Sequence, residues 1–213
     1  MPSHKPQIKN IPTLVKDNSL VEKRRRQIVE AAMKLFVQKG FHPTTTREIA
    51  RLAGISIGTL YEYIGSKEDV LYLVCEAIHA EMEAKIRQAL DEDRSGRQTL
   101  VNAIANYLQV CDRMQDSILL IYQESKSLDH DALKYVLAND ERITGIFQDI
   151  LLKGLADGTL FLNENDVKLI AHNIIVLGHM WTFRRWFLRR AFSLEDYIRV
   201  QTSFLLSELT SGR

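Results

Sequence analysis

The sequence contains few cysteines, few prolines and no long hydrophobic run. Its two cysteines, Cys75 and Cys111, are too few for the disulfide framework of a secreted protein, and they lack the spacing of metal ligands. No apolar run approaches the roughly 18 residues of a membrane span. The first eighteen residues lack the apolar segment of a secretory signal. These absences favour a protein of the reducing cytoplasm with no membrane partner.

Strand patterns and catalytic motifs are also missing. No segment alternates polar and apolar residues over the length of a strand, and no repeat occurs at solenoid spacing. The chain offers no serine nucleophile elbow, no glycine-rich phosphate loop and no cluster of metal ligands. Hydrophobic residues make up 46% of the sequence, which is enough for a full core. We therefore expect an all-α protein that is not an enzyme and that needs neither a cofactor nor a metal.

The charge is divided unevenly along the chain. Residues 1–67 hold twelve basic and five acidic side chains, a balance of +7, whereas the remainder carries −6. A basic segment attached to an acidic body is typical of a domain that binds a polyanion such as DNA. Ordinary solvated surface charge would give the same balance, so charge alone does not decide.

Capping signals and apolar spacing predict about nine helices. The first has a capping box at residues 19–22 and stops at Gly40. Two short helices follow at residues 45–54 and 56–63, and Ser66 begins a long helix that runs to about residue 93. The remaining spans are expected at 97–111, 113–127, 131–157, 165–190 and 194–209. Three domains follow from this pattern: a flexible basic tail at 1–18, a three-helix DNA-binding domain at 19–67, and a helical ligand-binding and dimerisation domain at 68–213.

The two short helices have the form of a helix-turn-helix, whose second helix lies in the major groove of DNA. Ala50 and Ala53 are small enough to let the helices approach closely across the turn at Gly54. Hydroxyl groups on the second helix can donate to phosphate oxygens, and Gly58 lets the duplex backbone come near. Free amides at the start of the first short helix, together with Arg47, suit a further phosphate.

Residues 41–71 closely resemble the DNA-binding signature of the TetR family of bacterial one-component regulators. The matching elements are Gly-Phe at 40–41, Thr-Thr-x-Arg-Glu-Ile-Ala at 44–50, Ala-Gly-Ile-Ser-x-Gly-Thr-Leu-Tyr-x-Tyr at 53–63, and Ser-Lys-Glu-Asp-x-Leu at 66–71. One departure is Ile64, where the family usually has an aromatic residue. The resemblance implies DNA contacts from Thr45, Thr46, Arg47, Ser56, Ile57, Gly58, Thr59, Tyr61, Tyr63 and Lys67. The tyrosine rings could instead pack between helices, and Lys67 could be an ordinary surface lysine.

The same resemblance implies that the C-terminal domain dimerises and holds a small effector. Interface candidates are Ile174, Leu177, Phe187, Tyr197, Val200, Phe204 and Leu205, and each could equally belong to the core of one chain. The segment 172–190 combines aromatic residues with four arginines, a composition that suits an acyl-coenzyme A thioester; pairing of these arginines with the acidic body is the alternative. His172 and His179 are seven residues apart, which does not suit zinc. The residues expected to line the pocket are Tyr107, Cys111, Met114, Tyr122, Phe147, His179, Trp181, Arg184 and Arg185.

The sequence thus predicts a ligand-responsive repressor that binds a palindromic operator as a homodimer and leaves it when a hydrophobic or acyl-coenzyme A-like effector binds. A non-specific architectural DNA-binding protein and an enzyme with an attached DNA-binding domain are the alternatives. No sequence pattern specifies the effector, the operator, the regulated genes, whether these are repressed or activated, or a redox role of Cys75 and Cys111.

Overall fold

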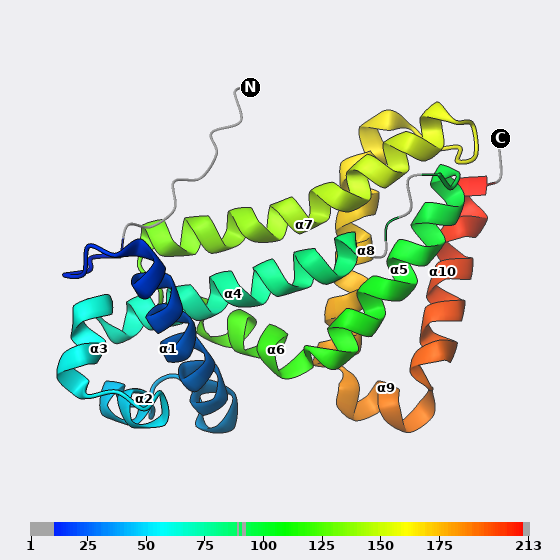
Figure 1. The fold of residues 1–213 in the computed structure, drawn as a ribbon. Helices are drawn as coiled ribbons and strands as arrows, with labels where there is room; N and C mark the ends of the chain where they lie inside the picture. Colours follow the sequence, from blue (N-terminus) through cyan, green and yellow to red (C-terminus); the bar gives the residue numbers. More distant parts are fainter. Residues whose placement is uncertain (1–10, 89, 91–92, 211–213) are drawn as a thin grey trace. The chain divides into compact units, whose positions relative to one another are not determined.

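The computed structural model describes residues 11–88, 90 and 93–210, and in this part of the chain all regular structure is helical. These residues form ten α-helices, and Figure 1 shows their order along the chain. Two of the helices are connected to the next one by a short 3-10 helix. The contacts divide the chain into two units. Unit 1 holds the described chain up to Ala80 together with Leu119–Asn139, and unit 2 holds Glu81–Ile118 together with the described chain from Asp140 onward. Within these residues, no helix has both the length and the apolarity to cross a membrane.

Three helices at the start of unit 1 form the expected helix-turn-helix domain: α1 (Asn18–Lys39), α2 (Thr46–Leu52) and α3 (Ile57–Tyr63). Their shared core is made by apolar side chains that the helical spacing turns inward, namely Ile28, Ala32, Phe36, Ile49 and Leu60. Gly54, with φ +71°, makes the turn between α2 and α3 in a conformation that favours glycine. The first helix begins two residues earlier than expected, at Asn18, because Asp17, rather than Ser19, caps it and accepts from the amides of Ser19 and Leu20.

Residues 11–16 are not the free tail that the sequence suggested. Ile11 is buried, and its carbonyl oxygen accepts a hydrogen bond of 2.8 Å from Arg25 Nη2. The amide of Leu14 donates to the carbonyl oxygen of Glu62 at 2.9 Å. These contacts hold the segment against α1 and the end of α3; residues 1–10 of the expected tail lie outside the described residues.

The rest of unit 1 comes from four further elements or parts of them. Helix α4 (Lys67–Arg87) begins in unit 1 and ends in unit 2, and α6 (Gln115–Glu124), the short turn η1 (Ser125–Ser127) and the start of α7 (His130–Ala156) complete the unit. Tyr72 of α4 and Tyr135 of α7 pack with ring centroids 5.3 Å apart. The division by contacts therefore falls inside α4, whereas the boundary expected from the sequence at 67–68 remains a prediction.

Unit 2 is built on α5 (Gly96–Arg113), the second part of α7, α8 (Val167–Phe183) and α10 (Leu194–Thr210). Its centre contains Tyr107, whose ring packs edge-on against Phe147 at 5.5 Å and whose hydroxyl donates to the carbonyl oxygen of Ile175 at 2.9 Å. The single helix expected at 165–190 is in fact two, because the chain bends at Arg184 and continues as α9 (Arg185–Ala191). No proline or glycine marks this bend, so the sequence pattern missed it.

Candidate nucleic-acid interface

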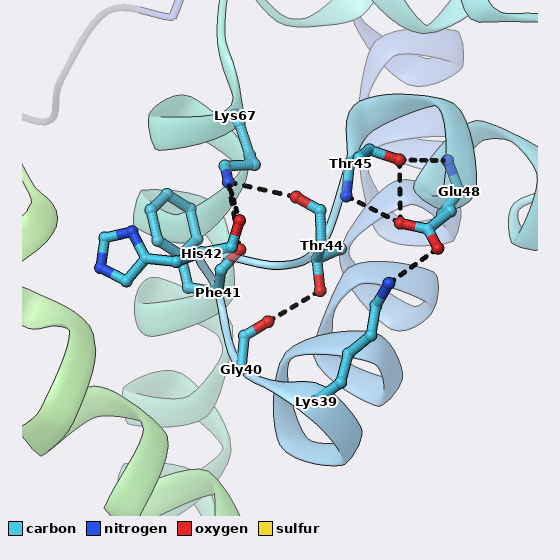
Figure 2. A network of polar contacts seen from close by, with 8 residues as sticks. All are labelled: Lys39, Gly40, Phe41, His42, Thr44, Thr45, Glu48 and Lys67. Carbon is cyan, nitrogen blue, oxygen red and sulfur yellow. Dashed lines mark hydrogen bonds and ion pairs between the residues drawn. The ribbon is translucent and has the colours of Figure 1, made fainter.

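The start of α2 is a fully formed capping box. The amide of Glu48 donates to Thr45 Oγ1 at 3.3 Å, and the amide of Thr45 donates to Glu48 Oε2 at 2.9 Å. Lys39 Nζ lies 2.7 Å from the other carboxylate oxygen, as Figure 2 shows. The hydrogen bond from Lys39, followed by those from the backbone and side chain of Thr45, lowers the pKa of Glu48 to about 2. The carboxylate therefore stays ionised at neutral pH and fixes the helix terminus that was expected to meet phosphate.

The outward surface of the helix-turn-helix contains most of the residues expected to touch DNA. Ser56 caps α3 by accepting from the amide of Thr59 at 2.9 Å. Thr46 Oγ1 and the hydroxyl of Tyr61 share a hydrogen bond of 3.1 Å that ties α2 to α3 across this face. The remaining members are exposed or half-buried: Thr45, Arg47, Ile57, Gly58 and Thr59. Hydroxyl groups, the Arg47 cation, Ile57 and Gly58 are thus accessible to a ligand on this surface.

Tyr63 does not belong to this surface. Its side chain is buried in the core of the domain with 4% of its area exposed, and its carbonyl oxygen accepts from Arg25 Nε at 3.0 Å. The expectation that its ring faces outward is wrong, because Tyr63, like Leu60, lies on the buried side of α3. The alternative in which the ring packs between helices is the one observed.

Lys67 also differs from expectation. Its ammonium group donates to the carbonyl oxygens of Phe41, His42 and Thr44 at 3.1, 3.2 and 3.1 Å. It also lies 4.2 Å from the centroid of the Phe41 ring. All three of its protons are therefore used by the turn between α1 and α2. The side chain is thus directed at the backbone of this turn, and its expected contact with a DNA phosphate remains a prediction.

Comparison with known proteins places this architecture in a family. Residues 28–72 match the family model described as "Bacterial regulatory proteins, tetR family", and residues 93–206 match "Tetracyclin repressor-like, C-terminal domain". The chain belongs to the TetR family. As a TetR-family member it is a DNA-binding transcriptional regulator with a helix-turn-helix, as the sequence predicted.

Individual relatives cover most of this TetR-family chain. The transcriptional regulator HbdR of Aromatoleum sp. (strain CIB) is 30% identical over 189 residues, which cover 89% of this chain and 82% of HbdR. The transcriptional repressor KstR2 of Rhodococcus jostii (strain RHA1) is 25% identical, covering 83% of this chain and 85% of that protein. The crystal structure of AibR in complex with isovaleryl coenzyme A and operator DNA has the same fold, with a TM-score of 0.69, 16% identity, and coverage of 85% and 97%. HbdR is named as a transcriptional regulator and KstR2 as a transcriptional repressor, and neither is named as an enzyme.

The residues expected to line an effector pocket are only partly brought together. Tyr107, Cys111 and Phe147 are fully buried in unit 2, with Met114 nearly so. A Cβ atom added to Gly178 would lie 2.6 Å from both Cys111 Sγ and Tyr107 Cε1, so α5 and α8 are in tight contact there. Tyr122, in contrast, belongs to unit 1 and exposes 68% of its area. The three core residues therefore form a packed interior.

The cationic end of α8 and α9 is tied to acidic residues of unit 2. Arg185 pairs with Asp116 at 2.8 Å, and Arg189 pairs with Asp112, which also accepts from Trp181 Nε1 at 2.8 Å. Arg184 lies over the Trp186 ring at 5.2 Å, and His179 stacks on Phe183 at 5.6 Å. Two of the arginines considered for phosphate binding thus have carboxylate partners, which agrees with the alternative prediction that these arginines pair with acidic residues of the C-terminal domain. Asp112 was missed because nothing in the sequence relates it to a tryptophan 69 residues away.

A hollow of about 510 Å³ lies elsewhere in unit 2, between α5 and α10. Its lining includes Arg97, Val101, Ile198, Thr202 and Leu206, and none of the nine expected pocket residues. Among residues 11–88, 90 and 93–210, no group of histidine, cysteine and carboxylate side chains could hold a metal ion.

Both cysteines are expected to be inert in the folded protein. Cys75 and Cys111 have no exposed area, and burial raises the pKa of each thiol to about 12. Since the thiolate is the reactive form, a thiol reagent such as dithionitrobenzoate should modify neither residue in the native protein at pH 8, and both after unfolding in guanidinium. Rapid modification of either cysteine without denaturant would contradict the burial described here.

Proposed function

We propose that the protein is a ligand-responsive repressor that binds a palindromic operator as a homodimer in the cytoplasm and is released by a small effector. The observation that carries the proposal is the open row of residues on α2 and α3, from Arg47 to Tyr61, above a core that is closed by Ile49 and Leu60. The repressor KstR2 and the operator-bound AibR support the same role by similarity.

Dimerisation is supported by apolar side chains exposed on α8 and α10. On α8, Leu169, Val176 and Met180 follow one stripe, and on α10 Val200 and Phe204 do the same. Two such helices from each chain can pack as a four-helix interface with twofold symmetry. Ile174 and Tyr197, considered for this interface, are instead buried within one chain, whereas Phe187 of α9 is exposed and Leu177 and Leu205 are half-buried.

The effector is proposed to be a hydrophobic molecule such as an acyl-coenzyme A thioester. AibR, which shares the fold, was crystallised with isovaleryl coenzyme A. In this chain the exposed Arg184 and Arg190 flank the aromatic residues Trp186 and Phe187, so cations and apolar surface are neighbours. Binding of the acyl chain in unit 2 would require the packed side chains around Tyr107 to move.

Repression and release follow from linkage. The dimer would hold two α3 helices about 34–36 Å apart, the distance between successive major grooves on one face of DNA. An effector that binds more tightly to a conformation with a different spacing of the two α3 helices shifts the population away from the DNA-bound form. By linkage, bound DNA must lower the affinity of the protein for the effector by the same factor. Moving the equilibrium from almost all bound to almost all free needs roughly 5 kcal/mol of differential affinity.

The test is selection of genomic duplexes with the purified protein, followed by titration of the selected inverted repeat and a scrambled duplex between 50 and 200 mM salt. We expect a preference of at least about 10³ for the repeat. The logarithm of the binding constant should fall linearly with the logarithm of salt, by about 0.9 per phosphate neutralised. Equal binding of both duplexes would indicate an architectural DNA-binding protein, and a flat salt dependence would exclude a phosphate-binding surface.

A further inference from the structure

The turn between α1 and α2, residues 40–45, is held by an unusual contact from α4. Lys67, the first residue of α4, places its ammonium group among three carbonyl oxygens of this turn, all within 3.2 Å. The same group lies over the face of the Phe41 ring at 4.2 Å. Figure 2 shows the lysine reaching from α4 into the turn, with the carbonyls of Phe41, His42 and Thr44 directed at it. Charge-assisted hydrogen bonds of this kind are stronger than neutral ones.

The position of this turn determines where α2 begins. Thr44 is buried, and its Oγ1 donates to the carbonyl oxygen of Gly40 at 2.7 Å, which closes the turn on itself. The next residue, Thr45, caps α2, and Arg47 follows two residues later. A displacement of the turn would therefore move the helix terminus and the cation that the proposed function assigns to phosphate contact.

We propose that Lys67 is a positioning residue for operator binding, which fixes the start of α2 through the turn and does not itself hold a phosphate. The inference rests on the proposed function and replaces the role that the family resemblance implied for this lysine. An ammonium group has three protons, and each is already donated to a carbonyl oxygen. To reach a phosphate it would have to break at least one of these bonds and leave the Phe41 ring.

The turn has a second support, so the domain should fold without Lys67. His42 Nε2 lies 3.7 Å from Glu124 Oε2 and 3.4 Å from Ser127 Oγ, which joins the turn to the end of α6 and to η1 within unit 1. Phe41 also packs edge-on against Phe36 at 5.3 Å. Loss of the lysine contacts should therefore loosen the turn without unfolding it.

The first experiment uses the protein without DNA and compares amide hydrogen exchange in wild type and Lys67→Met. We expect the amides of residues 44–49 to exchange roughly tenfold faster in the variant, the size expected for loss of charge-assisted hydrogen bonds. Protection in α5 should not change. Unchanged protection of residues 44–49 would overturn the proposal, whatever the protein does with DNA.

The second experiment measures operator affinity against salt for Lys67→Met, with Arg47→Gln as the matched control. If Lys67 positions α2, its loss should weaken binding about tenfold with little change in the salt slope, whereas loss of Arg47 should reduce the slope by about 0.9. A slope reduced equally in both variants would make Lys67 a phosphate ligand and overturn the proposal. Failure of the wild type to prefer any palindrome would instead refute the proposed function, and the exchange result would still decide the contact.

A charge-conserving variant separates the two roles again. In Lys67→Arg the positive charge remains, but a planar guanidinium cannot donate to three converging carbonyls as an ammonium does. We expect weaker operator binding and faster exchange in the turn despite the retained charge. Wild-type affinity together with wild-type exchange in this variant would show that charge alone matters, and this would overturn the positioning role.

Discussion

Replacement of Gly58 by aspartate is expected to abolish operator binding while the fold is preserved. Gly58 is exposed in the first turn of α3, and a Cβ atom there would meet only Ser56 Oγ at 3.7 Å, an ordinary contact. A carboxylate in the first turn of a helix favours the helix, so α3 should form as before. Against DNA, the same carboxylate would face the phosphates at the closest approach of the recognition helix. Like charges placed together at an interface cost several kcal/mol, which corresponds to a loss of affinity of about 100-fold or more.

Gly58→Ala is the control for this variant, because it adds bulk without charge. It should raise the free energy of unfolding by up to about 1 kcal/mol, as alanine does in helices, and weaken operator binding less than aspartate does. Anisotropy titration of the selected operator measures the affinities, and circular dichroism measures the stabilities. Operator binding by Gly58→Asp at wild-type strength would show that the face of α3 around residue 58 is not apposed to DNA.

The helix-turn-helix could be predicted from the sequence because its signals are local. The capping box at Thr45 and Glu48 and the cap at Ser56 are each made by residues within three positions of one another, and the two short helices begin close to the residues that the sequence predicted. The turn at Gly54 also needs only a residue type that accepts a positive φ. Local signals of this kind are the same in any protein that contains them.

The roles of Tyr63 and Lys67 could not be predicted in the same way, because each depends on a partner that is distant in the sequence. Tyr63 is buried in the core of the domain and its carbonyl oxygen accepts from Arg25, 38 residues earlier, while Lys67 donates to carbonyls 23 to 26 residues earlier. A motif records only that a lysine recurs at a position. It does not show whether the ammonium group is directed at solvent or at the protein backbone.

The interior of unit 2 was the least predictable part. The sequence predicted that Tyr107, Cys111 and Phe147 line an effector pocket, and in the structure they are buried in unit 2. An apolar helix face serves equally well as core or as pocket lining, so the pattern does not separate the two. Two arginines of the 172–190 segment form ion pairs with carboxylates on other helices. Arg189 pairs with Asp112 of α5, and Arg185 pairs with Asp116 of α6. Gly96 is the first residue of α5 and lies at a close crossing with α7, a contact that no local sequence pattern predicts.

This crossing makes Gly96→Ala the most destabilising small substitution that we expect in unit 2. A Cβ atom on Gly96 would lie 2.2 Å from Gly154 Cα and 2.3 Å from Gly154 N, so it would collide with backbone and not with a side chain that could rotate. To make room, α5 would have to move away from α7 and lose the 2.6 Å hydrogen bond from the Gly96 amide to Asp157 Oδ2. Overpacking of this kind costs about 3 kcal/mol, which in a chain of this size lowers Tm by roughly 6–12 °C.

Gly145→Ala is the matched control, since it makes the same chemical change within α7, the other helix of the crossing. A Cβ atom there would have nothing within 4 Å, and its φ is not positive. Alanine should then stabilise the helix by about 0.5–1 kcal/mol, because it restricts the unfolded chain and favours helix. Thermal unfolding followed by circular dichroism should therefore move Tm in opposite directions for the two variants. Equal shifts would mean that the effect at Gly96 comes from helix propensity alone, and that α5 and α7 are not in backbone contact at Gly154.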